Sequence, residues 1–171
     1  MGTEWQPAVT KIYKETAEGW NTLTQYLKQI EVSTISDFLA HEYNMIKDPA
    51  HLPIHFIRSH VAELTMTDGS VSHCHLEEEL PAGEFIKFKS NNGHWNVDKF
   101  DPTLAQFSAY TYRVTGNFMM VTDLQGIKTD DGFHLTDPVI LCHDTTRFGS
   151  TNLGAPFIDR CLESLKAMLD G

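Results

Sequence analysis

The chain has 171 residues, 41% hydrophobic and 11% aromatic, which suits a globular core in one domain or in two small lobes. Acidic residues outnumber basic ones 23 to 13, and the formal charge of −10 argues against nucleic acid or an anionic membrane surface as a partner. Neither a secretory leader nor an apolar run of membrane-spanning length stands out, and three cysteines fit no disulfide framework. A cytoplasmic protein with reduced thiols is expected.

The first third of the chain predicts one strand followed by two helices. Residues 8–13 alternate as in a short strand that contains Lys11, whose simplest role there is a solvent-facing one. Apolar residues recur at helical spacing in residues 20–30 and again in residues 35–43. Four polar residues offer N-cap side chains, so we expect a second helix to begin there: Ser33, Thr34, Ser36 and Asp37.

The middle of the chain favours short strands joined by turns. Residues 51–64 suggest an extended segment, and Asp68-Gly69 predicts a turn from which residues 71–77 pair back as a hairpin. The histidines of this region lack a metal-ligand spacing and fit surface or cross-strand positions. Residues 77–83 change from strand to a Pro/Gly connection, which favours a hinge between two lobes.

Two further helices and a second hairpin are expected toward the C-terminus. Residues 103–112 suit a helix with Pro102 in its first turn, and residues 157–169 present one apolar helical face. Residues 114–126 are predicted to form a hairpin that turns at Gly116-Asn117.

Residues 119–138 carry acidic groups on either side of a turn signal, Asp130-Asp131-Gly132. Gln125 precedes Asp131 by six residues and Asp137 follows it by six, so the two could face each other across a hairpin. Asp123 and Gln125 are two apart and would share one face of an extended strand. Such oxygen ligands suit a hard divalent cation, and the simpler alternative is that these groups only face water.

Residues 148–154, FGSTNLG, contain two glycines five apart with hydroxyl and amide side chains between them. A loop of this kind exposes backbone N–H groups that can hold an anion or a peptide backbone, although an ordinary surface loop fits the pattern too.

Together these pieces resemble the alpha-kinase family, the atypical protein kinases that include myosin heavy chain kinases and elongation-factor-2 kinase. The resemblance is carried in order by four motifs: FIKFKSNNG at 85–93, VTDLQGI at 121–127, LTDP at 135–138 and FGSTNLG at 148–154. Weaker matches are VTKIYK at 9–14 and FLAHEYN at 38–44. The resemblance implies a single domain over residues 1–171 with an α+β, two-lobed protein-kinase-like fold, whose lobes comprise about residues 1–80 and 81–171.

The family also implies ATP as the phosphoryl donor, Mg²⁺, and a serine or threonine of a protein or peptide as the acceptor. Lys11 matches the lysine that reaches the ATP phosphates, Glu77 falls where the adenine edge is held, and Asn91 is assigned to nucleotide binding. Gln125 and Asp137 match the Mg²⁺ ligands. Asp123 is the acidic partner beside them, and Asp137 sits at the phosphate transfer point.

The same resemblance assigns the glycine loop to the peptide-substrate side of the cleft. The residues expected there are Gly149, Thr151, Asn152 and Gly154.

The sequence departs from the family pattern in three respects: the glycine-rich loop, the zinc ligands and the residue at position 89. Residues 1–10 contain a single glycine, Gly2, so the glycine-rich loop that covers the phosphates is expected to be largely missing. Ala109 stands where the first ligand of a structural zinc is expected, residues 157–171 contain one cysteine, Cys161, and Lys89 stands where the family favours asparagine. No structural zinc is therefore expected.

Three functional hypotheses follow. The first is an ATP- and Mg²⁺-dependent serine/threonine kinase, and the second is a non-catalytic alpha-kinase-like domain that binds nucleotide or a protein partner. The third is a metal-dependent hydrolase built on the same carboxylates. It has little support because no nucleophile or histidine base stands near Asp123 or Asp137 in sequence, although His134 and His143 could approach in space.

Overall fold

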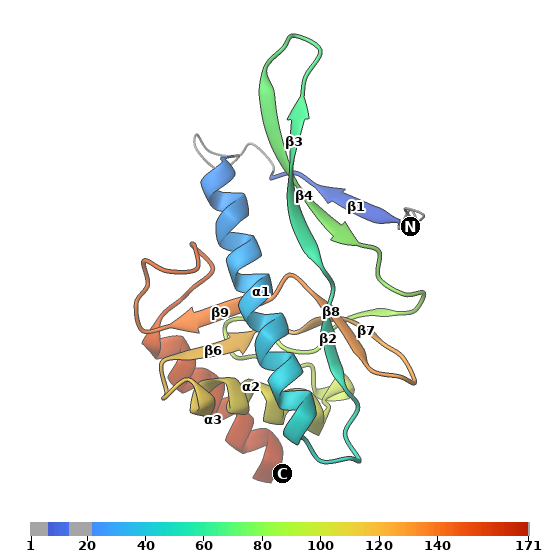
Figure 1. The fold of residues 1–171 in the computed structure, drawn as a ribbon. Coiled ribbons are helices and arrows are strands. Elements are labelled where there is room, and N and C mark those ends of the chain that lie inside the picture. The colour runs from blue at the N-terminus through green and yellow to red at the C-terminus, as the bar shows by residue number, and fades with distance from the viewer. Residues whose placement is uncertain (1–6, 14–21, 171) are drawn as a thin grey trace.

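The computed structural model describes residues 7–13 and 22–170, so Gly2 and Trp20 of the sequence predictions lie outside the described residues. Three sheets and three α-helices form the α+β fold that was predicted (Figure 1). A three-stranded sheet lies at the top of this view, and a four-stranded and a two-stranded sheet lie lower. None of the helices within the described residues is long and apolar enough to span a membrane.

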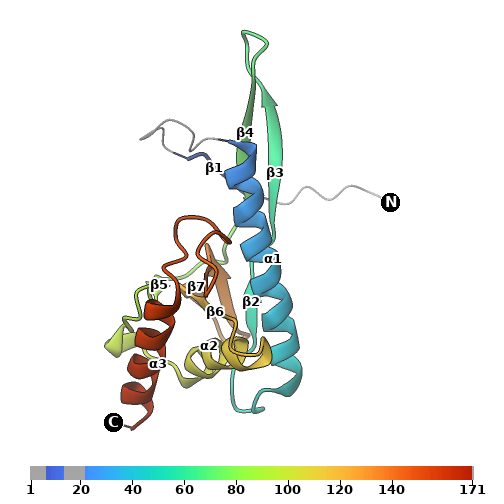
Figure 2. The same cartoon turned by 90° about the vertical axis from the view of Figure 1, so that its left-hand side faces the viewer.

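The upper sheet has the strand order β1-β4-β3 and consists of β1 (Ala8–Lys11), β3 (Ser59–Thr65) and β4 (Val71–Glu78). The hairpin predicted around Asp68-Gly69 is confirmed, since β3 and β4 pair antiparallel across it. Figure 2 shows this hairpin projecting beyond the body of the molecule. β1 pairs with β4 so that Lys11 lies directly opposite His75.

α1 (Leu23–Ile46) is one continuous helix of 24 residues, and the prediction of two helices was wrong. The polar segment 33–37 does not begin a helix. Ser33 and Ser36 are instead buried on its inner face, where small side chains allow close packing. Neither glycine nor proline interrupts the segment, so the helical hydrogen bonds continue through it. Near its end, the amide of Asn44 bonds both the N–H and the C=O of Ile54 and so fixes β2 (Ile54–Phe56).

The middle sheet has the strand order β2-β8-β7-β5. It joins β2 to β8 (Phe133–Thr136), β7 (Gln125–Lys128) and β5 (Phe85–Lys87). β7 and β8 form the predicted hairpin around Asp130-Asp131-Gly132, but Gln125 pairs with Thr136 and not with Asp137. Only glycine fits at position 126 in this register, because a Cβ there would lie 2.0 Å from the carbonyl oxygen of His134.

The second predicted hairpin, over residues 114–126, was wrong. α2 (Pro102–Val114) extends to Val114, and Gly116 and Asn117, with φ of 66° and 63°, then turn the chain out of the helix. β6 (Met119–Thr122) pairs antiparallel with β9 (Val139–Cys142). The N-terminus of α2 agrees with expectation, since Asp101 accepts a hydrogen bond from the Thr103 N–H and Pro102 occupies the first turn.

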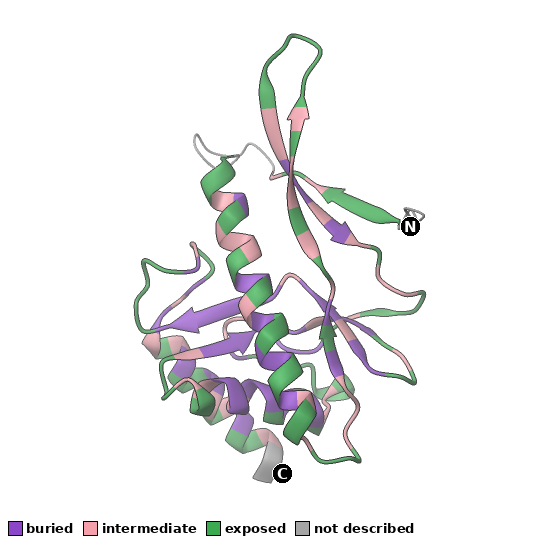
Figure 3. Cartoon of the chain, viewed as in Figure 1, coloured by how far each residue is buried: buried purple, intermediate pink, exposed green. Residues whose placement is uncertain are grey.

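The core lies mainly below the upper sheet, between α1, α2 and the middle sheet (Figure 3). A smaller apolar cluster joins β6 and β9 to α3 (Ala155–Asp170), whose Ile158 and Cys161 are fully buried, as the predicted apolar face of this helix requires. A short 3-10 turn, η1 (Val97–Lys99), precedes α2.

Candidate active site

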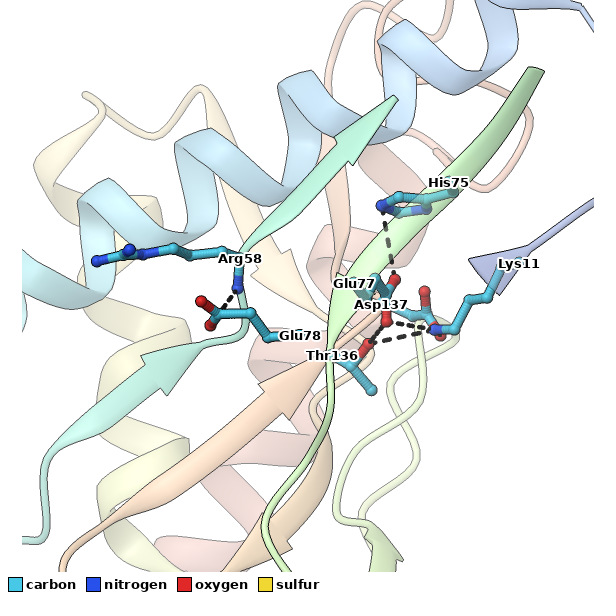
Figure 4. A network of polar contacts seen from close by, with 7 residues as sticks. All are labelled: Lys11, Arg58, His75, Glu77, Glu78, Thr136 and Asp137. Carbon is cyan, nitrogen blue, oxygen red and sulfur yellow. Dashed lines mark hydrogen bonds and ion pairs between the residues drawn. The ribbon is translucent and has the colours of Figure 1, made fainter. Parts of the chain in front are cut away.

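Lys11 lies at the centre of a polar network that links the upper and middle sheets (Figure 4). Its Nζ lies 2.6 Å from Oε2 of Glu77 on β4 and 2.7 Å from Oδ2 of Asp137, just after β8. Burial alone lowers the pKa of Lys11, but hydrogen bonds to Asp137 and Glu77 raise it above its usual value. Lys11 is therefore a fixed cation, and its side chain is turned into the fold instead of toward open solvent.

Glu77 is the buried member of the network, with a side chain only 4% exposed. Oε2 also accepts a hydrogen bond of 2.8 Å from the hydroxyl of Thr136, and Oε1 lies 3.6 Å from Nε2 of His75. Burial lowers the pKa of His75, which favours the neutral imidazole. His75 and Thr136 were not singled out from the sequence, although the alternation along β4 places His75 and Glu77 on one face.

Asp123 and Asp137 both stand just outside strands, with φ of 55° and 49°. The left-handed backbone is uncommon for residues other than glycine, although Asp adopts it more readily than most, and it is a frequent feature of functional sites. The expectation that Asp123 and Gln125 share an extended strand face was therefore wrong. Lys87 lies 2.7 Å from Oδ1 of Asp123, and this ion pair is the sole partner that the described residues give that buried oxygen. This role of Lys87 was not predicted from the sequence.

Two adjoining clefts share Lys11 and Asp137. The first, the apolar cleft, has a volume of about 470 Å³ and lies beside the connection that follows β4. Besides the shared pair it is lined by the apolar residues Val9, Ile57, Leu80, Pro81, Phe85 and Ile127 and by the polar residues Glu77, Glu78, Glu79 and Thr136. The second, the acidic cleft, has a volume of about 580 Å³. Besides the shared pair it is lined by Thr10, Ile12, Tyr13, Tyr26, Gln29, His75, Asp123, Pro138, Val139 and Thr151. The Lys11–Asp137 pair thus stands at the junction of two clefts that both combine apolar side chains with carboxylates.

Gln125 and Asn91 are not among the residues that line these two clefts. Gln125 is half-buried on β7, paired with Thr136 and Lys87 in the neighbouring strands. Asn91 donates a hydrogen bond of 3.3 Å to the carbonyl of Thr151. The structure therefore connects Asn91 to the glycine loop, and it brings Lys11, Glu77, Asp123 and Asp137 together.

In the glycine loop, Thr151 faces the acidic cleft while Asn152 turns inward and is 6% exposed. The four hydrogen bonds of the Asn152 amide join the N–H groups of Cys142 and Gly154 to the carbonyls of Asp144 and Arg147. Gly149 has φ of 80° with open space around it, and Gly154, at φ of 77°, would bring a Cβ within 2.8 Å of Thr145. Asn152 therefore shapes the loop, and Thr151 is the side chain it presents to the cleft.

A divalent cation would find oxygen ligands in the acidic cleft. No group of three or more His, Cys, Asp or Glu side chains able to hold a metal is gathered within residues 7–13 and 22–170. Mg²⁺, however, usually takes only one or two protein carboxylates together with water and phosphate oxygens. Asp123 and Asp137 line one cleft, and Asp123 has an oxygen without a well-aligned hydrogen bond, so this pair fits such an ion.

The positions named for zinc lie in or beside the apolar clusters. Ala109 packs at the edge of the main apolar cluster, and Cys161 is fully buried in the smaller one. Lys89, 1% exposed, lies between them, with Nζ 2.8 Å from Oγ of Ser108 and 5.0 Å from the centre of the Trp95 ring. Burial lowers the pKa of Lys89 to about 8, and the charge interaction with Cys161 offsets only part of this lowering.

Comparisons with known proteins agree with this arrangement. The sequence pattern of the Alpha-kinase family matches residues 3–167. Over 147 residues the chain is 35% identical to Alpha-protein kinase vwkA of Dictyostelium discoideum, covering 85% of this chain and 23% of that protein. Over 162 residues it is 32% identical to Myosin heavy chain kinase A of the same organism, covering 92% of this chain and 13% of that protein. The chain thus spans less than a quarter of either relative.

Among solved structures, the alpha-kinase domain of myosin-II heavy chain kinase A in complex with AMP-PNP superposes with a TM-score of 0.80 at 30% identity. The match covers 96% of this chain and 63% of that one. An alpha kinase from Entamoeba histolytica gives the same TM-score at 26% identity, covering 92% of this chain and 64% of that one. The chain therefore belongs to the alpha-kinase family, and its α+β fold is that of a kinase-type domain.

Proposed function

We propose that this domain is an ATP- and Mg²⁺-dependent serine/threonine protein kinase that transfers the γ-phosphoryl group of ATP to a protein hydroxyl. The observation that carries the proposal is the Lys11–Asp137 ion pair, 2.7 Å long, at the junction of the apolar and acidic clefts. A nucleotide has a flat apolar base at one end and anionic phosphates at the other, so its base can lie among apolar side chains of one cleft while its phosphates meet the Lys11 cation at the junction.

The apolar cleft suits the adenine, because its aliphatic and aromatic side chains can cover both faces of a planar base. The backbone of the connection after β4 borders this cleft at Leu80 and offers hydrogen-bonding groups to the edge of the base. Lys11 then contacts the ATP phosphates where the apolar cleft meets the acidic cleft. Solved structures of the myosin heavy chain kinase A domain hold AMP-PNP or ADP, which supports nucleotide binding in this family. The two clefts lie between the lobes that we place at about residues 1–80 and 81–171.

Asp123 and Asp137 would hold Mg²⁺, which neutralises charge on the phosphate oxygens when bound. Gln125, the other ligand implied by the family, would need to turn toward Asp137 from its place on β7 beside Thr136. Lys11 and Lys87 form ion pairs of 2.7 Å with Asp137 and Asp123, respectively, and hold these two carboxylates in place.

The acceptor hydroxyl would enter through the acidic cleft. Asp137 is 41% exposed and lines this cleft as well as the apolar one, so its second oxygen can orient the incoming hydroxyl. Thr151 of the glycine loop faces the same space. A net charge of −10 favours basic peptides as substrates, because the whole surface then attracts them. On the same charge argument we propose that neither nucleic acid nor a membrane is a partner, and from the composition we propose a cytoplasmic location.

The test is phosphate transfer from ATP to a basic peptide, with and without Mg²⁺, by the wild-type chain and by Asp137→Ala. We expect Mg²⁺-dependent transfer that falls by at least about a hundredfold in the variant. Equal transfer by the two proteins would contradict the assignment of Asp137.

A second candidate is a domain that binds nucleotide without turnover. It is favoured by one specific observation: Lys11 is already paired with two carboxylates, and ATP must displace at least part of this network. A thermal-shift measurement with ATP and Mg²⁺, combined with the transfer assay, separates the two candidate functions. A ligand at a hundred times its Kd stabilises the fold by about 2.7 kcal/mol, which makes binding detectable. Binding with no transfer to any peptide or to the protein itself would favour this second candidate.

A further inference from the structure

Helix α1 is apolar on two opposite faces. Its inner face packs on the body of the domain, and the buried residues there are Tyr26, Val32, Ser33, Ser36, Leu39, Ala40 and Tyr43. At about 3.6 residues per turn, a second set of residues shares the opposite face and recurs at steps of three or four. We call this set the outer stripe, and its members are Leu23, Leu27, Ile30, Thr34, Phe38, His41 and Met45. All but Thr34 and His41 are apolar.

The outer stripe is exposed to solvent. Phe38 is 61% exposed and Met45 is 75% exposed, and Leu23 and Leu27 are exposed toward the other end of the helix. α1 lies in front of the sheets in Figure 1, and exposed segments recur along its front in Figure 3. A surface helix usually has one apolar stripe and a polar face opposite it, so a second apolar stripe indicates a second packing partner.

The C-terminal half of the outer stripe borders a groove of about 510 Å³. α1 forms one wall of this groove with Thr34, Phe38 and His41, and β2 with the segment that leads to β3 forms the other. The outer stripe therefore has a concave neighbour that can receive side chains of a partner lying along α1.

Acidic side chains flank this half of the outer stripe. Asp37 and Glu42 lie on opposite sides of it around the helix, and both are exposed. Neither belongs to an ion pair formed within the described part of the chain. Among the residues that line the groove, two carboxylates, those of Asp37 and Glu78, stand beside one guanidinium, that of Arg58. The surface therefore favours a partner that carries positive charge.

A second copy of the chain fits this surface poorly. If two outer stripes paired antiparallel about Thr34, Glu31 of one copy would lie opposite Asp37 of the other, and like charges would meet. Each copy also has a formal charge of −10, which opposes association. A helix with basic flanks would instead place cations beside Asp37 and Glu42.

We propose that the outer stripe of α1 is a docking surface for a basic amphipathic helix. The partner has apolar residues at steps of three or four, which cover Phe38 and Met45, and lysine or arginine on either side, which pair with Asp37 and Glu42. No residue of the outer stripe lines the apolar or the acidic cleft, so docking leaves both clefts open and the inference does not depend on kinase activity.

The test measures, by fluorescence anisotropy, binding of the full chain to a synthetic helix of leucine and lysine whose leucines follow the spacing of the outer stripe. A leucine–glutamate helix with the same leucine pattern is the charge control. We expect the lysine helix to bind at least about tenfold more tightly than the glutamate helix. Phe38→Ser should weaken its binding at least about tenfold. Val97→Ser is the matched control, because Val97 is an exposed apolar residue on η1, outside α1 and the groove, and should change affinity less than about twofold.

Two further variants separate the contributions of apolar contact and charge. Met45→Ser repeats the apolar test at a second exposed position, and circular dichroism checks that each variant keeps its helix content. The double variant Asp37→Asn, Glu42→Gln should weaken the lysine helix several-fold at low salt and by less at high salt.

Absence of binding to the lysine helix, or equal binding of the two synthetic helices, would overturn the proposal. Equal affinity of the wild type and Phe38→Ser would overturn it as well, because the lysine helix would then bind only the general negative charge of the chain. Sedimentation supplies the remaining outcome. Self-association that Phe38→Ser abolishes would show that a second copy occupies the outer stripe, which would also contradict the proposal.

Discussion

Lys89→Met tests the consequence of burying a cation without a carboxylate. The ammonium is 1% exposed, and Ser108, Met120 and the Trp95 ring are its neutral surroundings. Burial lowers the pKa of Lys89 from 10.5 to about 8, and a difference of that size corresponds to roughly 3 kcal/mol. Methionine has a similar length and no charge to desolvate. We expect Lys89→Met to raise the free energy of unfolding at pH 7, by up to about 3 kcal/mol less the lost bond to Ser108.

The pH dependence distinguishes this cause from better packing. Between pH 8 and 10.5 the unfolded chain binds a proton at Lys89 that the folded chain has released, so wild-type stability rises with pH across this range. The advantage of Lys89→Met should therefore shrink by about 2 kcal/mol between pH 7 and pH 9.5.

Urea unfolding of both proteins at the two pH values measures this difference, and subtracting one from the other cancels groups they share. Lys166→Met, at an exposed position on α3, is the control and should change stability by less than about 0.5 kcal/mol at either pH. A stability difference between wild type and Lys89→Met that stays constant with pH would refute the reasoning, and so would a Lys89→Met variant less stable than the wild type at pH 7.

Three substitutions probe the scaffold that positions the site, each by urea unfolding. Gly126→Ala should lower the free energy of unfolding by more than about 3 kcal/mol, because its Cβ would lie 2.0 Å from a backbone carbonyl oxygen. Gly69→Ala, at φ of 83° with nothing within 4 Å, should lower it by only about 1 kcal/mol. Similar losses in the two variants would contradict the register of β7 and β8. Asn152→Ala removes an amide with four buried or half-buried bonds and should cost about 3 kcal/mol, and a loss below 1 kcal/mol would show that it does not shape the glycine loop. Asp101→Ala removes the N-cap of α2 and should cost about 1 kcal/mol, and unchanged stability would exclude a role in capping.

Local turn chemistry made much of the fold predictable. Asp68-Gly69 and Asp130-Asp131-Gly132 marked two hairpins, and Pro102 marked the start of α2, because these residues restrict the backbone wherever they occur. The continuous α1 was missed because Ser33 and Ser36 resemble caps in sequence. They are buried beneath the sheet instead, which is a property of tertiary packing.

The pairing of β6 with β9 was missed for a similar reason. Gly116-Asn117 fits a hairpin turn as well as the end of a helix, and only the distant strand β9 decides between them.

At the site, the sequence identified Lys11, Asp123 and Asp137, which the fold brings to one cleft. It could not identify Lys87, His75 or Thr136, because each acts through a partner on another strand. The predicted pairing of Gln125 with Asp137 was wrong by one residue, because the strand pairing ends at Thr136 and Asp137 leaves the strand with a positive φ. The register of two strands depends on the contacts between them, so the sequence of one strand alone predicts it only weakly.

The measurement that tests the kinase assignment most directly is intact-protein mass spectrometry of a basic serine- and threonine-containing substrate, incubated with the chain, ATP and Mg²⁺. The account predicts a mass increase of one or more phosphoryl groups on serine or threonine. This increase should be absent without Mg²⁺ and absent in Asp137→Ala. Unmodified substrate with the wild-type chain, despite ATP binding at the Lys11–Asp137 junction, would contradict the claim of catalysis.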